Sequence, residues 1–210
     1  MCRRVFIGFC SLFIMKRGVL KDWRIVTDIV ISLIIVVLVA IFLPPFFLLI
    51  SFILICTYLF LAKQKSAIYH LLVSFVIAVI WVIIARNYYS YNQKNLVLLG
   101  INLYPLFAWA LGLFGAYIIY CYWGNKLKEE NSLGRIFLFS AFYWLLLIVG
   151  EVIAYNFFNI HDLATSMYSA LPLCNCMHAP IWIQASYFAL GPLYFLFCDL
   201  FNLENRNFKI

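Results

Sequence analysis

The sequence predicts an all-α membrane protein, a bundle of six transmembrane helices with both ends of the chain on the cytoplasmic side. Its 210 residues are 67% hydrophobic and only 11% charged. Soluble domains carry about 25% charged residues, so this chain has too few to cover a water-facing surface. The apolar residues also form long, unalternating runs, which favours helices over strands. Basic residues cluster between alternate runs, as in cytoplasmic loops.

The predicted organisation is one membrane domain over residues 25–201, preceded by a basic segment (1–24) and followed by a short tail (202–210). The apolar stretch at 5–15 is too short to span a bilayer, because a spanning helix needs about 20 residues. It fits a helix that lies at the membrane surface, and Met15 is an alternative start of the chain.

The first three predicted spans are rich in Ile, Val, Leu and Phe. The first covers residues 25–43 and ends at Pro44-Pro45, because proline removes a backbone donor and restricts the residue before it. The second covers residues 46–62, and the third covers residues 67–85. These spans suit a lipid-facing scaffold, so we expect any function to lie in the second half of the chain.

The fourth predicted span begins near Leu103, with Asn102 as its N-cap and Pro105 in its first turn. It carries small residues at four-residue spacing, which let two helix backbones approach closely. Simple packing inside the bundle accounts for them. The residues are Ala108, Gly112 and Ala116.

The fifth predicted span covers residues 136–153, and the sixth covers residues 181–200 with a kink expected at Pro192. In the sixth, polar and small residues recur at steps of three and four, so they share one helix face. That face should point into the bundle, because a Gln amide facing lipid would lack partners. Its polar members fit either interhelical hydrogen bonds or the wall of a ligand pocket: Gln184, Tyr187 and Tyr194.

Lys and Arg set the predicted orientation. Thirteen of the fifteen fall before the first span or after the second, fourth and sixth, and the other side holds only Arg86 and Lys94. The positive-inside rule places the basic side in the cytoplasm, and we expect a cell membrane. Because these residues separate apolar segments rather than form one solvated face, no nucleic-acid partner is expected.

Ionisable residues inside spans are functional candidates because a buried charge is costly. Asp28, His70 and Asp199 lie near helix ends, from which we expect them to reach the membrane interface. Glu151 differs, since it lies inside the fifth span near its outer end. The outer loop that follows contributes a histidine and a second carboxylate, so three residues are candidates for general acid and base catalysis: Glu151, His161 and Asp162.

The same loop contains Cys174, Cys176 and His178 between Pro172 and Pro180. Sulfur and nitrogen atoms of this kind bind zinc and other transition metals, so these three residues are candidate metal ligands. A Cys nucleophile beside His178 is a second interpretation. The third is a folded loop whose cysteines act as small apolar residues. With one residue between the two cysteines, we expect a disulfide between them to be strained and uncommon.

The other outer loop, residues 86–101, carries three tyrosines. Aromatic rings favour the membrane interface, so an aromatic belt is one interpretation. A lid over the acid and histidine cluster is the other.

The stretch at 99–120, LGINLYPLFAWALGLFGAYIIY, is similar to a segment of membrane-bound carotenoid cyclases and covers about a tenth of the chain. Those enzymes carry paired acidic residues after the proline, whereas Leu106 and Phe107 follow Pro105 here. The resemblance therefore implies no catalytic residue in this chain.

Three functions remain open on the sequence. One is a small membrane enzyme that acts on a lipid or isoprenoid substrate near the outer leaflet. The alternative is a non-catalytic accessory subunit, packed against a protein partner or a second copy. A transporter or channel is the third, although the chain shows little intramembrane charge and no repeated half. Membrane lipids are expected partners in each case, and a transition metal is the cofactor that the cysteine loop suggests.

Overall fold

The computed structural model describes residues 44–61, 63–91, 97–127, 131–172, 174–201 and 203. These residues are mostly helical, with an α-helix in each of five segments: α3 (Pro44–Leu61), α4 (Lys65–Ile84), α5 (Leu103–Leu127), α6 (Ser132–Asn156) and α7 (Ile181–Leu200). A 3-10 turn, η2 (Arg86–Tyr88), and an antiparallel pair of short strands, β1 (Val97–Leu98) and β2 (Ile101–Asn102), lie between α4 and α5.

Four of these helices, α4 to α7, contain stretches long and apolar enough to cross a membrane, and α3 is a shorter apolar helix. The second to sixth predicted spans correspond to α3 to α7, and α7 has the predicted bounds. The first predicted span (25–43) and the segment before it (1–24) lie outside the described residues, as do residues 204–210 of the predicted tail. The described chain therefore holds five of the six predicted helices.

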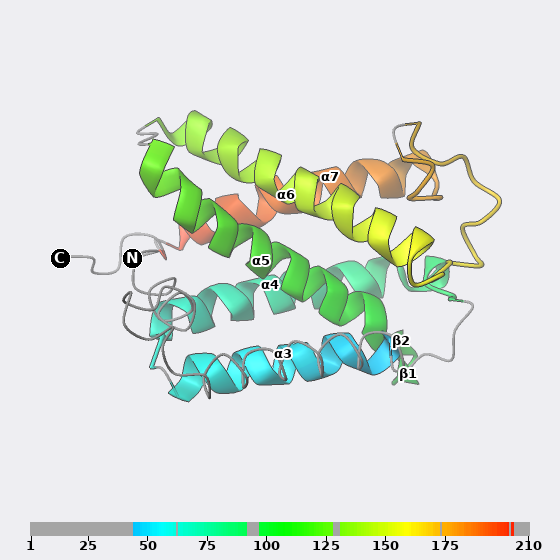
Figure 1. Ribbon diagram of the computed structural model, residues 1–210, viewed down its shortest axis with the longest axis horizontal. Coiled ribbons are helices and arrows are strands. Elements are labelled where there is room, and N and C mark those ends of the chain that lie inside the picture. The colour runs from blue at the N-terminus through cyan, green and yellow to red at the C-terminus, as the bar shows by residue number, and fades with distance from the viewer. Residues whose placement is uncertain are drawn as a thin grey trace, which may run out of the picture.

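The helices run back and forth between two ends of the bundle, and α5 lies between α3 and α6 (Figure 1). One end, which we call the loop end, holds η2, the two strands and the connection from α6 to α7 (157–180). The opposite end, which we call the turn end, holds the connection from α3 to α4 and the start of α6. The two long outer loops of the prediction thus lie at the same end.

Two N-caps explain where helices begin. The Asn102 Oδ1 atom accepts a hydrogen bond from the Tyr104 N–H at 3.0 Å, which confirms the predicted cap of α5. Asn131 does the same for α6, accepting from the Leu133 N–H at 3.2 Å. Because this cap lies before the uninterrupted apolar run, α6 begins earlier than predicted.

Helices α6 and α7 are joined by contacts around Pro192. The helix continues through Pro192, which has no N–H to donate to the Phe188 carbonyl. The Trp144 Nε1–H donates to that carbonyl instead, at 2.8 Å. One residue earlier, a Cβ on Gly191 would overlap the ring of Tyr143, so only glycine fits there. The contact of Tyr143 with Gly191 and the hydrogen bond from Trp144 to the Phe188 carbonyl together fix how α6 lies against α7.

The predicted inward face of α7 is confirmed, although Gln184 is only half-buried. Its other four members are buried: Tyr187, Gly191, Tyr194 and Cys198. His70 of α4 is buried as well, and the prediction that it reaches the membrane interface is wrong.

The His70 imidazole stacks on the Tyr117 ring, with centroids 3.6 Å apart, and its Nδ1 lies 3.3 Å from the Tyr194 hydroxyl. Asp199 does lie near a helix end, where it forms a half-buried ion pair with Arg135 at 3.8 Å.

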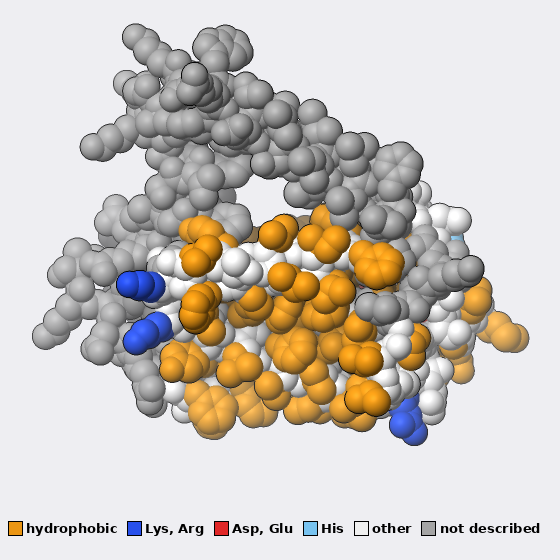
Figure 2. Space-filling model, turned by 90° about the horizontal axis from the view of Figure 1, so that it is seen from below, with side chains coloured by type: hydrophobic (Ala, Val, Ile, Leu, Met, Phe, Trp, Pro, Cys, Tyr) orange, Lys and Arg blue, Asp and Glu red, His pale blue; other side chains and the backbone are white. Residues whose placement is uncertain are grey.

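The outer surface of the bundle is largely apolar. Figure 2 shows one face covered with hydrophobic side chains, with the visible Lys and Arg side chains at its two ends. Ile53 and Leu54 of α3 and Leu72 and Ile80 of α4 are all more than half exposed. A surface of this kind suits lipid rather than water.

Candidate functional site

A cavity of about 640 Å³ lies against α5, lined also by residues of α3, α6 and the loop end. Its floor is made of small residues of α5, namely Ala108, Gly112 and Gly115. Nothing lies within 4 Å of the position that a Gly112 Cβ would take, so this glycine faces open space. Of the predicted small-residue stripe, only Ala116 is fully buried in packing. The other two members make room for the cavity.

One part of the cavity wall is purely aliphatic. α3 contributes Ile55 and Leu59, α5 contributes Ile118, and α6 contributes Leu146 and Leu147. Such a wall offers favourable contacts to a hydrocarbon chain, because apolar surfaces gain free energy when they leave water together.

The loop end of the cavity is polar, and the three predicted catalytic residues all line it: Glu151, His161 and Asp162. Glu151 follows Leu147 by one helical turn, so the aliphatic wall of α6 leads directly to its carboxylate. This carboxylate makes no hydrogen bond or ion pair with any described residue. The structure therefore brings together groups from α6 and from the connection after it.

Asp162 is held in place by the other outer loop. Its Oδ1 atom accepts hydrogen bonds from the Ser90 N–H at 3.1 Å and the Ala164 N–H at 3.0 Å. The backbone of the same segment pairs with Tyr91, and the Leu163 N–H donates to the Ser90 carbonyl. Burial raises the pKa of Asp162 to about 6, although the two N–H donors act in the opposite direction.

Two histidines flank Tyr155 of α6. The His161 ring meets it edge to face at a centroid distance of 4.2 Å, and the His178 ring stacks on it at 5.5 Å. His161 Nε2 pairs with the Asn159 side chain. His178 Nδ1 donates to the Tyr168 carbonyl at 2.9 Å, so its Nε2 is the free ring nitrogen; it is buried with no hydrogen-bond partner among the described residues. Both imidazoles line the cavity.

Tyrosines form much of the remaining polar wall. Tyr91 stacks on Tyr89 at 6.2 Å and meets Tyr104 edge to face at 5.3 Å. The Tyr89 hydroxyl accepts N–H bonds from Trp81 and Trp109, at 2.7 and 2.8 Å. Tyr89 and Tyr91 of the loop at 86–101 thus contribute to the cavity wall, and the interpretation of the whole loop as a lid stays a prediction.

These phenols stay protonated at neutral pH. Burial raises the pKa of Tyr89 above its ordinary range. Burial also raises the pKa of Tyr91 well above its ordinary value, with the neighbouring Tyr89, Glu151 and Asp162 adding to the effect. The Tyr91 side chain is therefore a hydrogen-bond donor rather than an anion.

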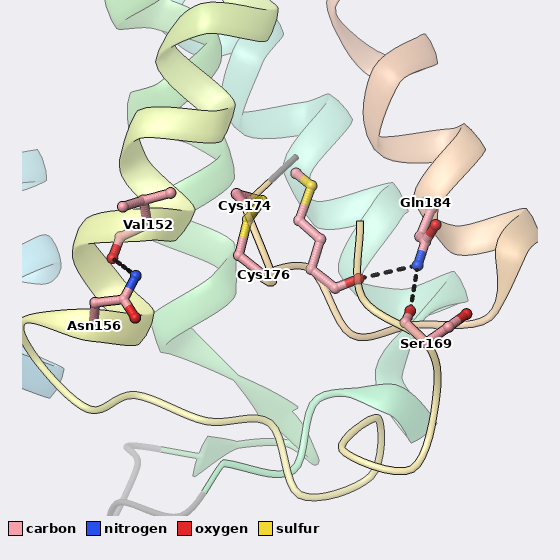
Figure 3. Close-up of a disulfide and its surroundings, with 7 residues drawn as sticks. Val152, Asn156, Ser169, Cys174, Cys176 and Gln184 are labelled. Atoms are coloured by element: carbon pink, nitrogen blue, oxygen red, sulfur yellow. Dashed lines mark hydrogen bonds between the residues drawn. A yellow bond between two sulfur atoms is a disulfide. The ribbon is translucent and has the colours of Figure 1, made fainter. Parts of the chain in front are cut away.

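The three predicted pocket residues of α7 have different surroundings. Tyr187 lines the cavity, whereas Tyr194 lies in the core beside His70. Gln184 supports the neighbouring loop, as Figure 3 shows. Its Nε2 lies 2.9–3.1 Å from three backbone carbonyls, those of Ser169, Met177 and Ala179.

The cysteine pair differs from expectation, because Cys174 and Cys176 form a disulfide with each other (Figure 3). Their Cα atoms are 5.1 Å apart, within the range that disulfides span. The left-handed backbone of Asn175, with φ of 46°, turns the chain so that the two residues face each other. Asn tolerates this conformation better than most residues, a local feature that spacing alone does not reveal.

In this oxidised state neither sulfur is a thiolate, the form that binds metals or attacks a substrate. Nor do any three His, Cys, Asp or Glu side chains of the described segments converge closely enough to hold a metal ion. Metal binding by Cys174, Cys176 and His178 stays a prediction, and it applies to the loop after the disulfide has been reduced.

No protein-family model matches this chain, and no curated protein or solved structure was found to match it.

Proposed function

We propose that this chain binds an amphipathic lipid or isoprenoid molecule in the cavity along α5 and acts on its polar end as a membrane-embedded enzyme. We base this on the change in lining along the cavity, from the aliphatic wall at Leu146 and Leu147 to the carboxylates of Glu151 and Asp162. A hydrocarbon tail fits the first part and a polar headgroup fits the second.

The acid–base residues have distinct roles in this proposal. Glu151, which has no described partner, is the group that exchanges a proton with the substrate. Asp162 is held in place by the N–H groups of Ser90 and Ala164. Its role in this proposal is to position the headgroup and to balance positive charge on it. His161, which also lines the cavity, is a second group that can carry the proton in this proposal.

The basic residues suggest how the protein is oriented in the membrane, and hence which leaflet supplies the substrate. Lys63, Lys65 and Arg135 lie at or near the turn end of the described chain, and Arg86 lies at the loop end. We place the turn end in the cytoplasm and the loop end at the outer face of a cell membrane, because basic residues favour the cytoplasmic side. With the predicted first span (25–43) added before α3, both termini are then cytoplasmic, and the headgroup lies in the outer leaflet.

Filling the cavity tests whether it binds a lipid. Gly112→Leu places a side chain in the open space above α5. Ala141→Leu, on the exposed face of α6 and outside the cavity lining, adds the same bulk as a control. Each protein is purified in a neutral detergent, and the lipids extracted from it are quantified by mass spectrometry. We expect one lipid species to be lost in Gly112→Leu and retained in Ala141→Leu. Identical lipid content in all three proteins would contradict binding in the cavity.

Glu151→Gln tests the chemistry separately from binding. The amide has the shape of the acid but cannot exchange a proton in the same way, so we expect the lipid to bind and its conversion to stop. The conversion is followed by mass spectrometry of a membrane lipid extract incubated with each purified protein. Conversion at the parent rate by the Glu151→Gln protein would rule out the catalytic role.

A further inference from the structure

The polar end of the cavity is rich in groups that attract positive charge. Two carboxylates, those of Glu151 and Asp162, line it together. None of its described lining residues is Lys or Arg, and Arg86, at the same end of the bundle, is exposed and does not line it. A headgroup bound here meets two carboxylates and no described Lys or Arg side chain, and the only basic groups of the described lining are the imidazoles of His161 and His178.

Aromatic rings surround the same space. Tyr91 and Tyr104, whose rings are in contact, line the cavity, and so does Tyr155, which lies beside the two histidines. The face of an aromatic ring carries negative potential, so rings of this kind attract ammonium groups. Together with carboxylates, they form the usual surroundings of a bound amine or quaternary ammonium ion.

The unpartnered state of Glu151 points the same way. Its carboxylate opens into the cavity and makes no hydrogen bond or ion pair with the described residues. An isolated charge away from water costs free energy. A ligand that supplies the opposite charge removes much of this cost when it binds. A phosphate headgroup would instead add like charge beside the two carboxylates and leave Glu151 without a partner.

We infer that the ligand of this cavity carries a cationic headgroup, an amine or a quaternary ammonium, bound between Glu151, Asp162 and the tyrosine wall. This inference, which rests on the function proposed above, narrows the substrate class to cationic amphiphiles. It separates them from phosphate and diphosphate lipids, which the polarity of the cavity alone would also admit.

Three probes with the same twelve-carbon tail test the headgroup: dodecyltrimethylammonium, dodecyl phosphate and a dodecyl glycerol ether. Each is titrated into the full chain in a neutral detergent, and bound molecules are counted by native mass spectrometry. We expect the ammonium probe to bind at least about tenfold more tightly than the phosphate probe. The glycerol probe should fall between them.

Variants separate the headgroup from the tail. Glu151→Gln and Asp162→Asn keep the shape of each side chain and should each reduce the preference for ammonium over phosphate. Gly112→Leu should weaken all three probes, and Ala141→Leu should weaken none. Thermal unfolding of each variant shows whether it folds as the parent does.

Two failures are distinguishable. If the phosphate probe binds as tightly as the ammonium probe and Gly112→Leu weakens both, the headgroup inference is wrong while the cavity still binds amphiphiles. If no probe binds saturably, or if Gly112→Leu changes nothing, both the inference and the proposed function are wrong.

Discussion

The indole N–H of Trp144 on α6 donates to the carbonyl oxygen of Phe188 on α7, at a distance of 2.8 Å. Pro192, four residues after Phe188, is the reason that this carbonyl has no donor from its own helix. One side chain thus replaces the missing helical hydrogen bond and links the helix that carries Glu151 to the helix that carries Tyr187. Both of those residues line the cavity.

Replacing Trp144 with Phe should destabilise the protein. The ring remains, but the Phe188 carbonyl loses its donor, at a cost of about 1–3 kcal/mol in unfolding free energy. Chemical unfolding in detergent measures this cost. Trp182→Phe is the control, because that partly exposed indole meets Trp81 edge to face and makes no hydrogen bond in the described chain. Equal stability of the two variants would contradict the role of Trp144.

Gly191→Ala should also destabilise the protein, by about 1–3 kcal/mol, because overpacking forces neighbouring groups to move. The added methyl would overlap the Tyr143 ring, whose hydroxyl donates to the Tyr187 carbonyl at 2.6 Å. Gly150→Ala is the control, since nothing lies within 4 Å of its Cβ position. We expect the control to unfold at the parent temperature or above it, as alanine favours helix. A parent-like Gly191→Ala protein would show that α6 and α7 are not in close contact.

The Asp162 carboxyl predicts a pH dependence of stability. Its pKa is raised from 3.8 to about 6 in the folded protein. Between these values the folded chain holds a proton that the unfolded chain has released, so this group favours folding at low pH, and that contribution is lost as the pH rises through about 6.

Asp162→Asn isolates this group from the other titratable groups of the same end, which include Glu151, His161 and Tyr91. Melting temperatures of parent and variant are compared between pH 5 and 7.5. We expect the parent to gain stability relative to the variant as the pH falls. A difference that stays constant with pH would contradict the buried position of Asp162.

The disulfide predicts a pattern of alkylation. Unfolded protein treated with iodoacetamide without reductant should carry no label on Cys174 or Cys176, and both should be labelled after reduction. Peptide mass spectrometry reads the sites, and Cys56, which is a free thiol, serves as the positive control. Labelling of both loop cysteines before reduction would show that they are thiols and would return the metal hypothesis to consideration.

Much of the helical framework could be predicted from sequence because its signals are local. α7 lies between Pro180 and the end of one apolar run, and α5 begins where Asn102 caps it. Glu151 was identifiable because a carboxylate inside an apolar span is costly. The helices before Pro44 stay predictions.

The features that sequence did not reveal depend on contacts between distant segments. His70 is buried because Tyr117 stacks on it, and the position of His70 in its own helix gives no sign of that partner. The small-residue stripe of Ala108, Gly112 and Ala116 is equally compatible with helix packing and with a cavity floor, because the spacing does not show whether a second helix covers it. Asp162 owes its position to Ser90, in a loop that precedes it by two helices.

Photocrosslinking tests the central claim most directly. Two dodecylammonium probes carry a diazirine, one beside the nitrogen and one at the end of the tail, and peptide mass spectrometry maps the labelled residues. We predict that the first labels the polar end near Glu151 and Asp162 and the second labels the aliphatic walls of α3 and α5, with both patterns lost in Gly112→Leu. Labels spread over the exposed face of α4 and unchanged in Gly112→Leu would contradict a lipid site in this cavity.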